Sequence, residues 1–261
     1  MKECTLNGHK VVLYDGIDEL PVVRFHRYNR YLLVDAGIGS DISDFDSHIE
    51  RVVRYIRKGD NENAGKELEN LRQNVFLIMS ENNVRHLSFA CLVKSIDGKP
   101  CDDLSDAALA KVVEMLGGAT RGELADEYQS AKKKIDDELG LYFPKLFDDV
   151  RSREFYDLLK RLTMTNLEQV IKGEDEARQQ QADKIQDDLM LFYKPKTFTG
   201  HDGLEVQHDR DFATMCLLIS KETGTEAKTM TVLEYYNAYE YIKDNAQKSQ
   251  QKARQTQNKA R

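Results

Sequence analysis

The chain has 261 residues, of which 40% are hydrophobic and 32% charged, and its formal net charge is −7. That length can bury one or two cores. Its longest apolar runs, such as 75–79, fall far short of the roughly 20 residues that span a membrane, and no secretory stretch follows Met1. We therefore expect a protein made inside the cell that has no membrane contact.

Motifs for catalysis or cofactor binding are missing from the sequence. The cysteines are scattered and form no Cys-x-x-Cys pair, which argues against zinc and redox motifs: they are Cys4, Cys91, Cys101 and Cys216. With only 4 prolines and no tryptophan, the composition favours a helix-rich chain. We predict that the protein is not an enzyme and has no cofactor, metal or catalytic residue.

The first residues favour a small β-hairpin, because residues 4–14 alternate around Asn7-Gly8, a dipeptide suited to tight hairpin turns. Amphipathic helices follow over 21–93. Pro21 begins the first, Ser40 or Asp41 caps the second and Asn61 caps the third. Apolar residues at three-and-four spacing predict buried stripes on the second and third helices: Ile49, Val52, Val53 and Ile56, then Leu68, Leu71, Val75 and Ile78.

Turn residues cluster at 95–100 and indicate a loop or boundary. Thr120 and Glu123 have capping-box spacing and open a charged helix. The polar portion 174–186 is typical of a solvated arm or a pairing surface. The expected fold is mainly α, a multi-helix bundle with a small N-terminal β-hairpin and an extended helical arm. Its expected parts are a hairpin plus helical core over 1–118, a charged helical arm over 119–195, a small C-terminal helical segment over 196–245 and a basic tail over 246–261.

Arg24, Arg27 and Arg30 alternate with aromatic residues, a pattern that can contact nucleic acid through phosphate pairing and base stacking. The same spacing also fits an amphipathic surface helix. The pairs His201-Asp202 and His208-Asp209 could bind a metal or shuttle protons. Exposed turn residues are the simpler interpretation of that glycine-rich stretch.

The C-terminal helix starts at a second capping box, Thr231 with Glu234. Its tyrosines suit a protein contact surface, although packing within the protein is the alternative: they are Tyr235, Tyr236, Tyr239 and Tyr241. The tail that follows carries cations and no acidic residue: Lys248, Lys252, Arg254, Lys259 and Arg261. Alone it should be mobile, and an acidic protein groove or nucleic acid could bind it.

Residues 211–238, including Thr231-Val232-Leu233-Glu234-Tyr235-Tyr236-Asn237-Ala238, resemble the C-terminal helical segments of poorly characterised tailed-bacteriophage proteins encoded among virion and tail-assembly genes. The blocks 20–25 and 35–40 resemble the N-terminal parts of similar proteins. This resemblance implies a non-enzymatic neck, tail or virion component in the virion or the bacterial host cytoplasm, and it carries over no functional residue.

The leading hypothesis is therefore a structural or assembly protein that forms homo- or hetero-oligomers with other virion or assembly proteins. The tyrosines and the basic tail are its candidate contact residues. The alternative is a nucleic-acid-binding accessory protein that uses the basic tail with Arg24, Arg27 and Arg30. A hydrolase or metal enzyme centred on His201, Asp202, His208 and Asp209 is the third hypothesis.

Overall fold

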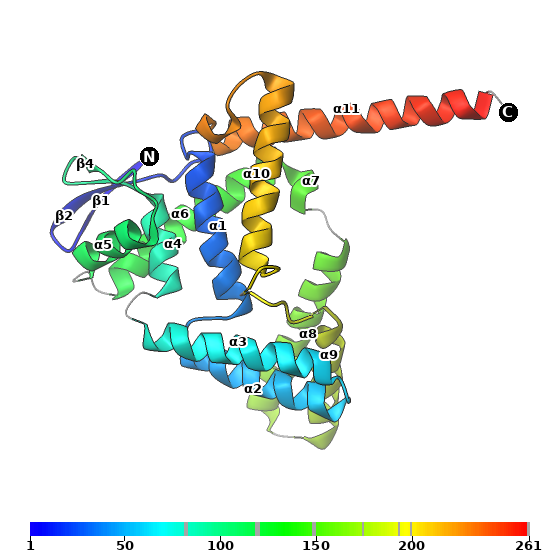
Figure 1. Ribbon diagram of the computed structural model, residues 1–261. Helices are drawn as coiled ribbons and strands as arrows, with labels where there is room; N and C mark the ends of the chain where they lie inside the picture. The colour runs from blue at the N-terminus through cyan, green and yellow to red at the C-terminus, as the bar shows by residue number, and fades with distance from the viewer. Residues whose placement is uncertain are drawn as a thin grey trace.

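The computed structural model describes residues 1–80, 83–117, 121–147, 150–173, 175–192, 194–198 and 200–259 (Figure 1). Helices make up most of it and a small antiparallel hairpin lies at the N-terminus, which confirms the predicted fold class. Within these ranges no helix combines the length and apolarity needed to cross a bilayer.

The N-terminal hairpin turns at Asn7 and Gly8, whose φ angles are 49° and 77°. The turn predicted within 95–100 is present, but the residues on either side of it form strands that extend the sheet and not a loop. Asp97 and Gly98, with φ angles of 50° and 76°, make a second tight turn between two short strands. The sheet is antiparallel in the order β1-β2-β3-β4: β1 (Lys2–Leu6), β2 (His9–Leu13), β3 (Val93–Ile96) and β4 (Lys99–Pro100).

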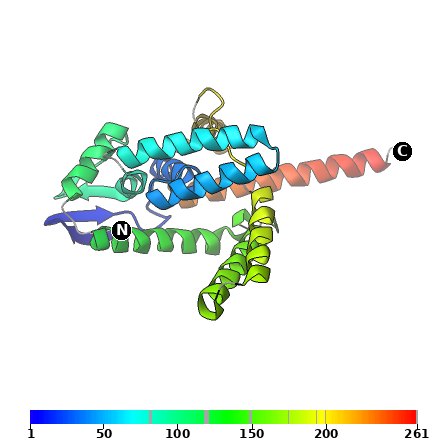
Figure 2. The same ribbon diagram turned by 90° about the horizontal axis from the view of Figure 1, so that it is seen from below.

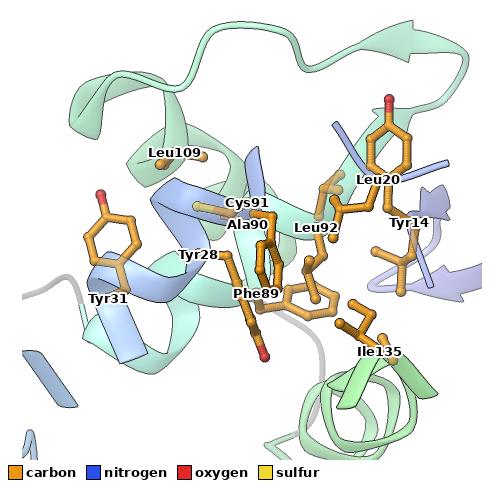
Figure 3. Packing of buried hydrophobic residues seen from close by; sticks show 14 of the residues in the cluster. Tyr14, Leu20, Tyr28, Tyr31, Phe89, Ala90, Cys91, Leu92, Leu109 and Ile135 are labelled. Atoms are coloured by element: carbon orange, nitrogen blue, oxygen red, sulfur yellow. The ribbon is translucent and has the colours of Figure 1, made fainter. Parts of the chain in front are cut away.

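The main core lies between this sheet and the helices on one side of it. Figure 3 shows Tyr28, Phe89, Leu92 and Ile135 meeting there, contributed by three different helices. Tyr28 belongs to α1, which packs along α4. The helices of the N-terminal half are α1 (Val22–Gly37), α2 (Ile42–Arg57), α3 (Asn61–Met79), α4 (Val84–Leu92) and α5 (Asp106–Leu116).

Helix α6 (Arg121–Tyr142) also belongs to this core, since Ala131, Ile135 and Leu139 are buried in it. Only the later part of the predicted 119–195 arm therefore stands apart from the main core. The first residue of the predicted capping box, Thr120, lies outside the described residues, so that interaction has no structural description.

After the short α7 (Pro144–Phe147), helices α8 (Val150–Lys172) and α9 (Glu176–Phe192) pack against each other and project from the body in both views (Figures 1 and 2). Ala182 and Ile185 of α9 are buried although the segment is polar. The Arg54 side chain of α2 donates to Asp183 and Gln186 of α9. The later part of the predicted arm is thus a helix pair attached to α2.

The C-terminal part consists of α10 (Leu204–Thr223), a 3-10 turn η1 (Ala227–Thr229) and α11 (Val232–Lys259). The predicted capping box is confirmed, because the Thr231 amide donates to Glu234 at 2.9 Å and the Glu234 amide donates to Thr231 at 3.3 Å. The Val232 amide donates to the Leu20 carbonyl at 2.9 Å, which fixes the start of α11 beside that of α1.

Beyond this anchor α11 extends away from the body (Figure 1). The tail predicted to be mobile on its own is a continuation of the helix through Lys259. The proposed boundary at residue 246 therefore falls inside one continuous helix.

Candidate functional site

Helices α2 and α3 form an antiparallel hairpin with a polar interior. Gly59, at a φ of 74°, allows the chain to turn. Asp41 caps α2 as predicted, whereas Asp60 takes the capping position of α3 that the sequence predicted for Asn61. The hairpin's inner side is lined by polar side chains that are at most 2% exposed: His48, Glu67, Asn70 and Asn74.

Two of these side chains attach the hairpin to the end of α1. His48 Nδ1 lies 2.7 Å from Glu67 Oε1, and His48 Nε2 lies 2.7 Å from the carbonyl oxygen of Ile38. Asn74 Nδ2 donates to the same carbonyl at 3.1 Å. Ile38 is the C-cap residue that follows α1. A connected set of buried polar groups therefore determines how the hairpin sits on α1.

Of the residues that the structure describes, Glu67 supplies the only carboxylate in this interior, and Arg51 also donates to it. Burial alone would raise the pKa of Glu67, but the hydrogen bond with His48 and the charge of Arg51 outweigh burial and lower that pKa. Glu67 is therefore ionised at neutral pH. An ionised pair of this kind is costly to break, because the remaining partner stays buried without its counter-charge.

The polar interior leaves the apolar side chains on the outside of the hairpin. The prediction that these stripes are buried is therefore wrong for most of their residues. Ile49 is 40% exposed, Ile56 is 56% exposed and Leu68 is 49% exposed, while Val52 alone of its stripe is buried. We call the following exposed set the apolar face: Ile42, Ile49, Val53 and Ile56 of α2, and Leu68, Val75 and Met79 of α3.

These residues lie on one side of the hairpin. On α2 they are about a quarter turn from His48, and on α3 they are about a quarter turn from Glu67 in the same rotational sense. Because the two helices are antiparallel, equal rotations bring both stripes to the same side. Arg54, which contacts α9, points to the other side of α2. The apolar face is thus a continuous strip that α9 does not cover.

A second candidate site is a groove of about 340 Å³ between α1, α10 and α11. His26 of α1 is stacked between two rings of α10, with centroid distances of 4.3 Å to His208 and 3.9 Å to Phe212. His26 Nε2 lies 2.9 Å from Asp209 Oδ1. Tyr235 and Tyr239 of α11 line the same groove.

Burial lowers the pKa of His26, and the hydrogen bond to Asp209 opposes this only in part. Burial also lowers the pKa of His208, whose Nδ1 is buried and has no hydrogen-bond partner in the described part of the chain. Both rings are therefore neutral at neutral pH. Neutral rings can stack without the repulsion that two imidazolium ions would suffer.

One ligand atom each from His26, His208 and Asp209 lies within 4.8 Å of the other two, a donor set that suits a transition-metal ion. The two imidazole planes, however, differ by only 13° and lie one above the other. Because each nitrogen lone pair lies in the plane of its ring, stacked rings do not point at one common position. One ring would have to turn before both could bind an ion. In the observed arrangement the rings serve to join α1 to α10.

The structure divides the histidine and aspartate set that the sequence singled out. His201 and Asp202 are exposed and contact each other at 3.2 Å, apart from the groove that contains His208 and Asp209. The sequence did not indicate His26 as their neighbour, because it lies 183 positions from Asp209. No spacing rule connects residues so far apart.

The predicted contact tyrosines lie in different surroundings. Tyr235 is buried and Tyr236 is partly buried against both cores, whereas Tyr239 is half-buried beside the groove. Tyr241 is 67% exposed. Packing within the protein therefore accounts for Tyr235 and Tyr236, and Tyr241 remains open to a partner.

Of the cationic residues predicted to bind a partner, the structure describes the side chain of one. Lys248 is exposed on α11. The side chains of Lys252, Arg254 and Lys259 are outside the described part of the structure, as is all of Arg261.

The three arginines of α1 are engaged inside the protein. Arg24 is 3% exposed and donates to the carbonyls of Cys91, Val93 and Cys101. Arg27 pairs with Asp106, and Arg30 pairs with Glu205 at 3.0 Å. The guanidinium groups predicted for phosphate contact are thus directed to acceptors of this chain.

Comparison of the chain with known protein families, with curated proteins and with solved structures found no match.

Proposed function

We propose that this chain is a non-enzymatic structural or assembly protein that acts by binding other protein subunits. The observation that carries this proposal is the apolar face of α2 and α3, which leaves large aliphatic side chains in water. Contiguous exposed apolar surface on a folded protein is typical of a protein contact site. Covering these half-exposed side chains stabilises a complex by roughly 1 kcal/mol for each of them, before the costs of association.

The interior of the hairpin supports this proposal. His48 and Glu67 join the two helices through a buried hydrogen bond, while the aliphatic side chains of the apolar face leave much of their area in water. The aliphatic residues Ile49 and Val53 are then available for another subunit. A hairpin that only had to be stable would bury them.

Helix α11 offers a second contact surface, since it extends from the body and exposes Tyr241 and Lys248. The resemblance of residues 211–238 to tailed-bacteriophage proteins favours a neck, tail or virion component, with other virion or assembly proteins as partners. The virion or the host cytoplasm is the corresponding location.

Size-exclusion chromatography with light scattering tests this proposal on the full chain, alone and with candidate tail or neck proteins. We expect a complex that is lost when Ile56 is replaced by aspartate. A matched control is Leu141→Asp, because Leu141 is 77% exposed but lies on α6. A chain that stays monomeric and binds none of these proteins would contradict the proposal. Salt-sensitive binding to DNA that disappears without residues 246–261 would instead support the nucleic-acid hypothesis.

A further inference from the structure

The exposed side of α2 carries opposite charges at its two ends, beside the apolar face. Asp46 lies near the start of the helix and Arg57 is its last residue. Both are exposed, and neither forms an ion pair with another residue in the described part of the chain. They are about three helical turns apart and lie on the same side of α2.

Two of the apolar residues between them are arranged about nearly the same midpoint. Ile49 and Val53 are centred on residue 51, and Asp46 and Arg57 are centred between residues 51 and 52. A second α2 helix that runs antiparallel across this midpoint brings Ile49 against the partner's Val53. The same placement brings Asp46 against the partner's Arg57, and twofold symmetry repeats each contact once.

We propose that the apolar face binds a second copy of this chain, with the two α2 helices antiparallel about a twofold axis. This inference rests on the proposed function and names the partner. Charge complementarity carries the choice, because each α2 supplies both the acidic end and the basic end that the other requires. An apolar centre with charged residues at its edge is the usual composition of a protein interface.

Such a dimer would join two α2–α3 hairpins into one four-helix arrangement, the kind of packing in which apolar strips of neighbouring helices cover one another. Leu68 of α3 is exposed on the same side as Ile49 and would be covered with it. The projecting α8–α9 pair does not interfere, because Arg54 holds α9 on the other side of α2.

A charge exchange in the full chain tests the pairing, with mass measured by light scattering at several protein concentrations. We expect a mass of twice 30.0 kDa, which is 60 kDa, for the unaltered chain. Arg57→Glu places like charges opposite each other at both ends and should weaken the dimer about fivefold to tenfold. Asp46→Arg should weaken it to a similar extent. The double variant restores opposite charges and should regain most of the affinity.

Mixing gives a second readout, which tests whether positions 46 and 57 lie at the contact. Chains with Arg57→Glu and chains with Asp46→Arg should prefer each other to their own kind. Circular dichroism should show the same helix content for both, because the two side chains are exposed.

A dimer that forms equally well with Arg57→Glu would place the contact elsewhere and overturn the inference, as would a double variant as weak as either single one. An unaltered chain that is monomeric at all concentrations would also overturn it. The monomer can still bind a tail or neck protein in a complex that Ile56→Asp abolishes. In that case the proposed function stands without self-association. If the monomer binds nothing, both fail.

Discussion

Replacement of Glu67 by glutamine removes one buried charge and keeps the shape of the side chain. Glu67 Oε1 is 2.7 Å from His48 Nδ1 and also accepts from Arg51. Removal of one partner of a buried ion pair costs roughly 3–5 kcal/mol. The Arg51 side chain is 20% exposed and can regain some water, so we expect about 3 kcal/mol, at the lower end of that range.

Hydrogen exchange followed by mass spectrometry measures this loss where it occurs, in the amides of α2 and α3. A loss of about 3 kcal/mol makes exchange through opening of the hairpin roughly 100-fold faster. Glu62→Gln is the matched control on the same helix. The Glu62 side chain is 81% exposed and, among the described residues, pairs only with Lys66, so its loss should change exchange by no more than about twofold. Equal exchange in the two variants would refute the role given to the polar interior.

Three further outcomes follow from the same structure. Arg24→Met leaves the carbonyls of Cys91 and Val93 without their donor and should lower the free energy of unfolding by about 3 kcal/mol, measured with urea. Arg24→Lys should recover only part of this free energy, because one ammonium group cannot reproduce the several N–H donors of the planar guanidinium group. The folded protein should also lose stability as the pH falls from about 7.5 to about 5.5. The pKa values of His26 and His208 are lowered by burial, so the unfolded chain takes up protons first, near the ordinary histidine pKa of about 6.5. His208→Phe keeps a ring for His26 to stack on and should remove part of this pH dependence, which thermal unfolding at both pH values can show. Gly59→Ala should destabilise the hairpin by about 1 kcal/mol, because the φ of 74° is unfavourable for a residue with a Cβ even though the space there is open.

Local patterns were enough to predict several features of the fold. The turn at Asn7-Gly8 depends on two adjacent residues, and the capping box of Thr231 with Glu234 depends on residues three apart. Interactions of this range can be read from sequence because the backbone determines their geometry. The strands over 93–100 were missed because such short strands lack a clear alternation, and because β3 takes its hydrogen bonds from β2 and β4 takes its own from β3.

The candidate site was harder to predict. Periodicity identified Ile49 and Ile56 as one stripe of α2, but it does not say which stripe of a helix faces inward. His48 and Glu67 take the inner positions because they can satisfy each other and the carbonyl of Ile38, which belongs to another helix. Such complementarity appears only when the three segments are brought together.

The contact role of the apolar face is tested most directly by the mass of the full chain in solution. The unaltered protein, and Leu141→Asp as control, should form a complex whose mass exceeds the 30.0 kDa of one chain, either alone or with a tail or neck protein. Ile49→Asp places a charge at the centre of the face and should reduce that mass to one chain without loss of helix. The same complex in all three proteins would contradict a contact role for the apolar face.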